Sequence, residues 1–326
     1  MPSRPRVFVT RRLPAAALAP LRAAATVEVF SEEEVPVPPA RLRAEVGDCA
    51  GLLALLTDRV DRALLEAAPE LRVVSLMSVG HDNVDVAACT QRRVAVCHTP
   101  GVLTETTADL CFALLMACAR RLPEGERAVR DGGWSAWAPF FLAGQDIWGQ
   151  TLGIVGLGRI GQAVARRARG FGMRVLYSGP SRKPEAEAES GARHVALDGL
   201  LAEADFVVLL APLLAETRHL IGAEQLARMK PTAVLVNVGR GPLVDEAALV
   251  EALRARTLWG AALDVFEREP LPPDHPLLSC PNLLAVPHIG SASVATRLAM
   301  ATLAAENLAA VLLGRPPAAC LNPAVL

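Results

Sequence analysis

The sequence has no surplus of charge of either sign, because 33 Lys and Arg residues stand against 34 Asp and Glu residues. A balanced charge provides no general attraction to nucleic acid or to an anionic membrane surface. Long hydrophobic runs are missing as well: the longest, Leu110 to Ala119, is too short to span a bilayer and predicts a buried helix. The stretch from Met1 to Arg12 also lacks the apolar segment of a secretory signal. We therefore expect neither a nucleic-acid partner nor a membrane.

Cysteine occurs without the spacing that disulfide frameworks and zinc sites require. The seven cysteines are an odd number and include no Cys-x-x-Cys pair. Such cysteine usage fits a reducing compartment. We expect a cytoplasmic protein without a metal site.

Apolar residues, by contrast, make up 52% of the sequence and are arranged in short runs. The length suggests two domains on a scale of roughly 150 residues each. Strand-like runs alternate with helical segments, which predicts βαβ units and parallel sheets. The first set of expected strands is Arg6–Thr10, Val27–Phe30, Gly51–Leu55 and Arg72–Ser75. The second set is Thr151–Gly156, Arg174–Ser178, Phe206–Leu210, Ala233–Val238, Gly260–Leu263 and Leu283–Val286.

Two long helices and one irregular segment complete this outline. The helices are expected over Thr104–Leu122 and Ser293–Leu313, and the irregular segment over Gly132–Gly149. The fold class we predict is α/β, with two Rossmann-like, doubly wound parallel sheets.

A Gly-x-Gly-x-x-Gly motif, formed by Gly156, Gly158 and Gly161, follows the first strand of the second set and opens a helix. In this context Gly156 makes the tight turn, Gly158 lets the backbone approach a pyrophosphate, and Gly161 allows close packing of helix on strand. The helix N-terminus then presents N–H groups and a positive dipole end to the phosphates. The motif predicts a dinucleotide site.

The segment after the next strand bears on which dinucleotide is bound. Enzymes that use NAD usually place a carboxylate there for the ribose 2′-hydroxyl, but this chain has Ser178, Gly179, Pro180, Ser181, Arg182 and Lys183 in sequence. Arg182 or Lys183 would attract a 2′-phosphate that a carboxylate would repel. The turn favours NADP(H), with NAD(H) possible. The alternative is a solvated basic turn in which Gly179 is required only for the geometry of the loop.

Three ionisable residues follow separate strands of the second set: Arg240, Glu269 and His288. The C-terminal ends of strands in an open α/β sheet are where ligands bind. An arginine, a carboxyl and a histidine that meet there could bind an anionic substrate and transfer a proton.

These segments resemble the D-2-hydroxyacid dehydrogenase family over essentially the whole chain, and within it the glyoxylate reductase/hydroxypyruvate reductase branch. The segments that carry the resemblance are Phe8–Arg12, Leu76–Gly80, Gly132–Trp137, Leu157–Gln162 and His288–Ala292. The resemblance implies a discontinuous substrate-binding domain, residues 1–105 and 289–326, with a dinucleotide-binding domain inserted at 106–288.

The resemblance also assigns roles to residues. Arg240, Glu269 and His288 would be catalytic. Substrate would contact Ser78, Val79, Gly80, Trp137, Arg240 and Ser291. The cofactor would contact Thr107, Gly156, Gly158, Arg159, Ile160, Gly161, Ser178, Gly179, Arg182, Pro212, Val238, Asp264, His288 and Gly290.

The expected reaction is reduction of glyoxylate and hydroxypyruvate to glycolate and D-glycerate by hydride transfer from NADPH. Arg240 and the Val79–Gly80 turn would orient the carboxylate. His288 would give a proton to the carbonyl oxygen while Glu269 stabilises the imidazolium. The alternatives are another enzyme of the same family and a non-catalytic protein that senses NAD(P)(H). Formate dehydrogenases carry an amide where Glu269 stands, and phosphoglycerate dehydrogenases commonly have an acidic residue at the ribose.

The loop before the phosphate-binding strand carries Trp134, Trp137, Phe140 and Phe141, although aromatic residues make up only 4% of the chain. Exposed aromatic clusters are typical of interfaces. The resemblance implies a homodimer in which Trp137 enters the neighbouring subunit's substrate pocket and limits substrate size. The alternative is that these aromatics pack within their own subunit.

Overall fold

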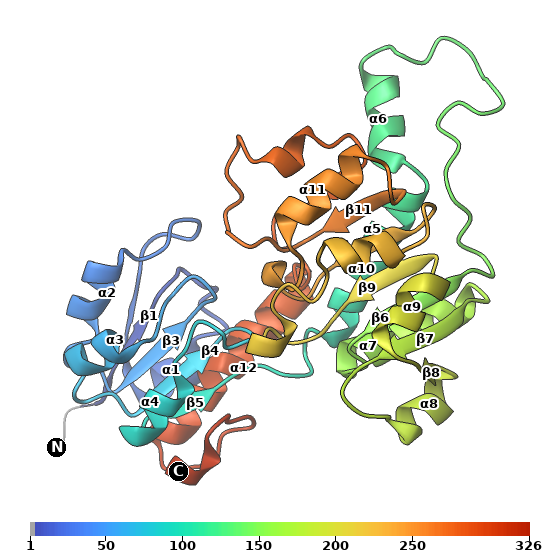
Figure 1. The fold of residues 1–326 in the computed structure, drawn as a ribbon. Coiled ribbons are helices and arrows are strands. Elements are labelled where there is room, and N and C mark those ends of the chain that lie inside the picture. The colour runs from blue at the N-terminus through green and yellow to red at the C-terminus, as the bar shows by residue number, and fades with distance from the viewer. Residues whose placement is uncertain (1–3) are drawn as a thin grey trace. The chain divides into compact units, whose positions relative to one another are not determined.

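The computed structural model describes residues 4–326, which form two compact units (Figure 1). One unit comprises residues 4–103 and 292–326, and the other comprises Thr104–Ser291. Each contains one wholly parallel sheet covered by helices. The predicted α/β class with two Rossmann-like sheets is confirmed. Residues 1–3 of the predicted substrate-binding domain lie outside the described residues.

The first unit has a five-stranded sheet in the order β2-β1-β3-β4-β5. Its strands are β1 (Arg6–Val9), β2 (Thr26–Val29), β3 (Gly51–Ala54), β4 (Val73–Leu76) and β5 (Ala95–Cys97). Its helices are α1 (Ala19–Ala24), α2 (Pro39–Glu45), α3 (Arg62–Ala67), α4 (Val86–Gln91) and α12 (Val294–Leu312).

Helix α12 returns from the far end of the chain to cover this sheet. The hydroxyl of Ser75 donates to the Ala304 carbonyl at 2.7 Å. A Cβ at Gly51 would lie 2.8 Å from Leu308 Cδ2, so glycine at this position lets the helix approach the sheet closely. The last part of the chain is therefore a packed part of the first unit.

The second unit has a seven-stranded sheet in the order β12-β11-β10-β9-β6-β7-β8. Its strands are β6 (Thr151–Val155), β7 (Arg174–Ser178), β8 (Arg193–His194), β9 (Phe206–Leu209), β10 (Val234–Asn237), β11 (Gly260–Leu263) and β12 (Leu283–Ala285). Its helices are α5 (Thr104–Ala119), α6 (Leu122–Arg130), α7 (Arg159–Gly170), α8 (Pro184–Ser190), α9 (Leu197–Glu203), α10 (Ala223–Arg228) and α11 (Glu246–Arg254). The strand order reverses between β6 and β9, and ligands of doubly wound sheets bind beside such a switch point.

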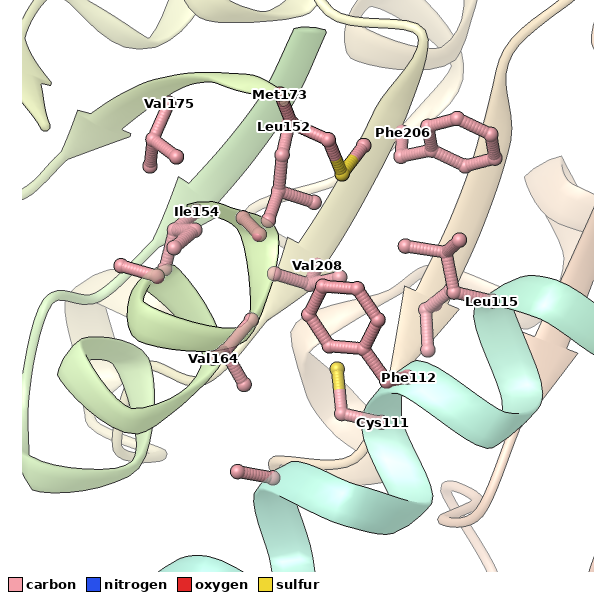
Figure 2. Close-up of a cluster of buried hydrophobic side chains, with 14 of the residues drawn as sticks. Cys111, Phe112, Leu115, Leu152, Ile154, Val164, Met173, Val175, Phe206 and Val208 are labelled. Atoms are coloured by element: carbon pink, nitrogen blue, oxygen red, sulfur yellow. The ribbon is translucent and has the colours of Figure 1, made fainter. Parts of the chain in front are cut away.

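Helices α5 and α7 pack against one face of this sheet, and Figure 2 shows the apolar cluster between them. Phe112 of α5 stacks on Phe171 with ring centroids 5.4 Å apart. Cys111 is fully buried beside it and fills space as a small apolar side chain. This core holds β6, and hence the glycine motif that follows it, in a fixed position.

The structure differs from the expectation at the predicted helix Thr104–Leu122. Helix α5 ends at Ala119, and α6 begins at Leu122. Arg121 between them has a φ of 53°, and Pro123, the second residue of α6, has a φ fixed by its ring. The predicted irregular segment is confirmed, since no helix or strand lies between α6 and β6 (Figure 1). No helix within residues 4–326 has the length and apolar character needed to cross a membrane.

Candidate functional site

The glycine motif makes the turn between β6 and α7 at the switch point of the second sheet. Gly156 has a φ of 98°, and a Cβ there would lie 2.8 Å from the Ala211 nitrogen. A Cβ at Gly161 would lie 2.5 Å from the Gly156 carbonyl oxygen, so this glycine brings helix and strand together. Gly158, the N-cap of α7, has open space where a Cβ would be. The turn thus leaves room for a phosphate group at a helix N-terminus, with Arg159 and Ile160 in the first helical turn.

A carboxylate that the sequence did not predict lies beside the end of β7. Glu187 of α8 accepts hydrogen bonds from the Tyr177 hydroxyl at 2.6 Å and from Arg182 Nη2 at 2.5 Å. The hydrogen bonds from Arg182 and Tyr177 lower the pKa of Glu187 to about 2. Arg182 is therefore held by an internal partner, while its side chain stays 68% exposed.

The rest of the basic turn lies close to the phosphate loop. Lys183 Nζ donates to the Leu157 carbonyl at 2.9 Å, which brings a cation to the glycine motif. His194 Nε2 lies 3.1 Å from the Gly179 carbonyl oxygen. A Cβ at Gly179 would meet nothing within 4 Å. Ser178, Gly179 and Lys183 form an open turn that can accept a negatively charged group.

His288 and Glu269 form a hydrogen-bonded pair, with 2.6 Å between His288 Nδ1 and Glu269 Oε2. Because a carboxylate can only accept, Nδ1 carries the proton, and Nε2 is the ring nitrogen left for exchange with a ligand. Burial raises the pKa of Glu269, but the His288 hydrogen bond and the positive charges of His288 and Arg240 outweigh it and leave the pKa below its ordinary value. Glu269 is therefore a carboxylate anion that accepts the Nδ1 proton of His288.

Arg240 follows β10 in a turn that a buried amide fixes. Asn237 is 1% exposed, and its Nδ2 donates to the Arg240 carbonyl at 2.9 Å while its Oδ1 accepts from the Gly239 N–H at 3.1 Å. The Arg240 guanidinium donates to the Gly239 carbonyl at 2.9 Å. Gly241, the next residue, packs against the backbone of Phe266 and Glu267, so Arg240 and Glu269 lie on adjoining loops.

The loop that carries Glu269 is tied to α11 by two further carboxylates. The Glu246 N–H donates to Glu267 Oε1 at 3.2 Å, and the Glu267 N–H donates to Glu246 Oε1 at 2.7 Å. His219 lies 3.2 Å from Glu267, and His275 lies 3.4 Å from Glu246. This reciprocal pairing holds the Val265–Glu269 loop, and thereby positions Glu269.

Asp264, directly after β11, fixes the backbone just after His288. Its two oxygens accept from the Ile289 N–H at 2.6 Å and from the Gly290 N–H at 2.8 Å. Burial raises the pKa of Asp264, although these hydrogen bonds and the charge of His288 oppose the effect. A Cβ at Gly290 would come 3.1 Å from this carboxylate, so glycine favours the contact.

The other predicted residues divide between the two units. Thr107 is buried and lies next to Gly290, with 3.5 Å between its methyl carbon and a Cβ built at Gly290. Val238 is buried directly after β10, and Pro212 follows β9, where its carbonyl accepts from the Thr217 hydroxyl at 2.7 Å. Ser291 is half-buried at the end of the second unit. The predicted anion-binding turn, Ser78–Val79–Gly80, lies in the first unit after β4.

Trp137 lies in the loop between α6 and β6 and is 80% exposed. Trp134, Phe140, Phe141 and Trp148 of the same loop are also exposed. In the single chain these aromatic side chains are exposed, and they do not pack within their own subunit as the alternative would require.

Several residues of this site went unpredicted. Three of them, Asn237, Glu246 and Glu267, act through hydrogen bonds to the backbone. Hydrophobic periodicity does not indicate such hydrogen bonds. Glu187 belongs to a short helix whose face could not be known from the sequence. The spacing of Asn237, the last residue of a buried strand, and Arg240, three residues later, was the one usable signal.

Both the sequence and the structure are similar to those of known proteins. Residues 112–290 match the family described as D-isomer specific 2-hydroxyacid dehydrogenase, NAD binding domain. A glyoxylate reductase of Korarchaeum cryptofilum is 51% identical over 326 residues, 99% of this chain and 97% of that protein. A glyoxylate reductase of Thermococcus onnurineus is 47% identical over 99% of this chain and 97% of its own length.

Solved structures match over nearly the whole chain as well. A protein from Thermus thermophilus is 50% identical, covers 97% of this chain and 99% of its own, and gives a TM-score of 0.91. An NADPH-dependent glyoxylate/hydroxypyruvate reductase from Sinorhizobium meliloti, solved with NADP and malonate, is 36% identical over 98% of each chain, with a TM-score of 0.88.

Proposed function

Because the chain belongs to the D-isomer specific 2-hydroxyacid dehydrogenase family, we propose that it reduces glyoxylate and hydroxypyruvate to glycolate and D-glycerate with NADPH. The observation that carries the proposal is the His288–Glu269 pair, 2.6 Å apart, with Arg240 nearby. Full-length similarity to glyoxylate reductases supports the choice of substrate. The family resemblance inferred from the sequence is confirmed.

The residues of the second unit suit a dinucleotide, and the nicotinamide of that cofactor supplies the hydride when it is bound. Gly156, Gly158 and the N-terminus of α7 would hold the pyrophosphate. Thr107 and Gly290 would border the nicotinamide end. We assign the second unit as the dinucleotide-binding domain and the first as the substrate-binding domain.

The chain's own part in the reaction is binding and proton transfer. Arg240 would pair with the substrate carboxylate, since a guanidinium matches that group in charge and geometry. His288 would donate its Nε2 proton to the carbonyl oxygen as that oxygen gains negative charge. Glu269 would stabilise the imidazolium before transfer and would keep the ring oriented. For 2-hydroxy acid oxidation the same nitrogen would act as the base.

Purified protein is expected to oxidise NADPH steadily when glyoxylate or hydroxypyruvate is added, with glycolate or D-glycerate formed in equal amount. Loss of NADPH absorbance and chromatography of the product measure this. A protein that binds NADPH but does not turn it over would instead be a dinucleotide sensor. Comparison with pyruvate, phosphohydroxypyruvate and formate would identify a different enzyme of the family.

We predict that kcat/KM is higher with NADPH than with NADH, and that Gly179→Asp reverses the preference. The open space at Gly179 accepts the new side chain, and a carboxylate there would repel a 2′-phosphate and accept from a ribose 2′-hydroxyl. We expect a shift in the NADPH to NADH ratio of about tenfold or more, from the loss of a charge-assisted contact. Gly179→Asn, similar in size but uncharged, is the control and should shift the ratio far less. A wild-type preference for NADH would contradict the assignment.

Glu187 gives a second test of the same assignment. If Arg182 recognises a 2′-phosphate, Glu187 competes for its guanidinium. Glu187→Gln should then lower the KM for NADPH relative to NADH, whereas Arg182→Ala should raise it. Equal changes in the KM for NADPH and for NADH would show that Arg182 does not recognise the 2′-phosphate.

We predict a homodimer in which the loop bearing Trp137 forms part of the interface. Trp137 and Phe140 are 80% and 87% exposed in the single chain, which is a costly surface for a monomer. Light scattering should give twice the chain mass. In addition, Trp137→Ala should raise activity on phenylpyruvate relative to glyoxylate. Trp148→Ala, which removes another exposed tryptophan of the same loop, is the matched control for this substrate ratio. A monomer at micromolar concentration would contradict the dimer. An unchanged substrate ratio would show that Trp137 does not limit substrate size.

A further inference from the structure

The turn at Ser78–Gly80 has its three carbonyl groups all bound from within the first unit. The Ser78 carbonyl accepts from the Thr99 N–H at 2.9 Å. The Val79 carbonyl lies 3.1 Å from His98 Nδ1, and the Gly80 carbonyl accepts from the Ser78 hydroxyl at 2.7 Å. Each of three consecutive peptide planes is therefore held by one hydrogen bond to its oxygen.

This arrangement dictates where the N–H groups of the turn point. In a planar trans peptide the N–H points away from the carbonyl of the same plane. With the oxygens of Ser78 and Val79 directed at Thr99 and His98, the N–H groups of Val79 and Gly80 face the opposite side. Neither of these N–H groups has a hydrogen-bond partner within residues 4–326. Adjacent N–H groups presented together form a site suited to an anion.

His98 is itself held rigidly by α12. Asn307 is 1% exposed, and its Nδ2 donates to the His98 carbonyl at 3.0 Å. The Asn307 Oδ1 accepts from the Ala318 N–H at 2.8 Å, which ties α12 to the chain beyond it. Because the Val79 carbonyl can only accept, the His98 ring must carry its proton on Nδ1 in this contact. The ring contact with His81, with centroids 6.4 Å apart, limits its orientation further.

We propose that His98 is a positioning residue for substrate recognition. Its Nδ1–H holds the Val79 carbonyl toward His98, so that the Gly80 N–H in the same peptide plane points the opposite way and meets the substrate carboxylate. The proposal rests on the proposed function and on the expectation from the sequence that this turn, together with Arg240, binds the carboxylate of the 2-oxo acid. Without the imidazole donor, the Val79–Gly80 peptide plane loses the hydrogen bond that sets its direction. No sequence pattern indicated this role, because a hydrogen bond from a side chain to a distant backbone carbonyl leaves no recognisable spacing in the sequence.

The test compares His98→Phe, which keeps a ring but has no donor, with His98→Asn, whose amide nitrogen can take the place of Nδ1. We expect His98→Phe to raise the KM for glyoxylate and the inhibition constant of oxalate by about tenfold, from one lost hydrogen bond and a misdirected peptide. The kcat and the Kd for NADPH should change by less than about threefold, because only carboxylate binding is lost. His98→Asn should restore both constants to within about threefold of the wild type.

Unchanged KM and inhibition constants in a folded His98→Phe variant would overturn the proposal, as would equal losses in the Phe and Asn variants. If His98→Phe fails to fold, the ring nitrogens of wild-type His98 are measured by nitrogen NMR. A proton on Nδ1 supports the proposal, and a proton on Nε2 alone refutes it. The proposed function is judged separately by the wild type: absence of glyoxylate reduction there would reject that function whatever the variants do.

Discussion

His288→Ala is expected to lower kcat for glyoxylate reduction by about a thousandfold, the scale of a lost general acid. The variant keeps the hydride donor and the carboxylate-binding groups, so NADPH affinity should change little and the KM far less than kcat. The physical reason is the 2.6 Å contact that fixes the His288 proton on Nδ1 and leaves Nε2 for the substrate oxygen. Steady-state kinetics and NADPH fluorescence titration measure the two effects.

His219 offers a matched control for this experiment. It also pairs with a carboxylate of the same loop, Glu267, at 3.2 Å. His219→Ala therefore removes a His–Glu pair without removing the proposed proton donor, and we expect activity within a few-fold of the wild type. Comparable losses in the two variants would mean that loop position, and not proton transfer, explains the effect of His288→Ala.

Gly241→Ala is expected to destabilise the protein by about 3 kcal/mol and to lower kcat/KM by about a hundredfold. A Cβ at Gly241 would lie 1.8 Å from the Phe266 carbonyl carbon and 2.5 Å from the Glu267 nitrogen. Neither atom belongs to a flexible side chain, so the backbone must move. The displaced segments carry Arg240 on one side and Glu269 on the other, and a shift of about 1 Å is enough to cost such a factor in rate.

Gly170→Ala is the control for this substitution. Gly170 is the last residue of α7, and a Cβ there meets nothing within 4 Å. Because alanine favours helix over glycine, that variant should be as stable as the wild type or slightly more stable. Urea unfolding and steady-state kinetics compare the two variants. A Gly241→Ala protein with wild-type stability and activity would contradict the predicted coupling of the two loops.

The sequence predicted the fold class because its buried strands are short apolar runs separated by turn residues. The strands Thr151–Val155 and Val234–Asn237 are fully buried, and their apolar runs were recognised in the sequence as strands. Strand β8, by contrast, has two residues, Arg193 and His194, whose polar side chains carry no strand pattern. The break between α5 and α6 was missed because Arg121 adopts a left-handed conformation that arginine rarely takes.

The structure brings together two of the residues predicted for the candidate site, while their catalytic roles stay predictions. His288 and Glu269, expected together at neighbouring strand ends, do form a pair. The residues that position them could not be predicted, because their role depends on contacts between distant segments. The contact of Glu246 with Glu267 spans 21 residues. Glu187 pairs with Arg182 only five residues away, and it was missed for another reason: the face of its short helix could not be known from the sequence.

The position of α12 has a consequence for the order in which the chain folds on the ribosome. Ser75 and Ala304 are hydrogen-bonded across 229 residues, and the second unit lies entirely between them. During synthesis, β4 leaves the ribosome long before the helix that covers it. The second unit can complete its own sheet first, because all of its strands belong to one continuous stretch. The unit that begins first is therefore finished last, and until then one face of its sheet depends on chaperones or transient contacts for protection from aggregation.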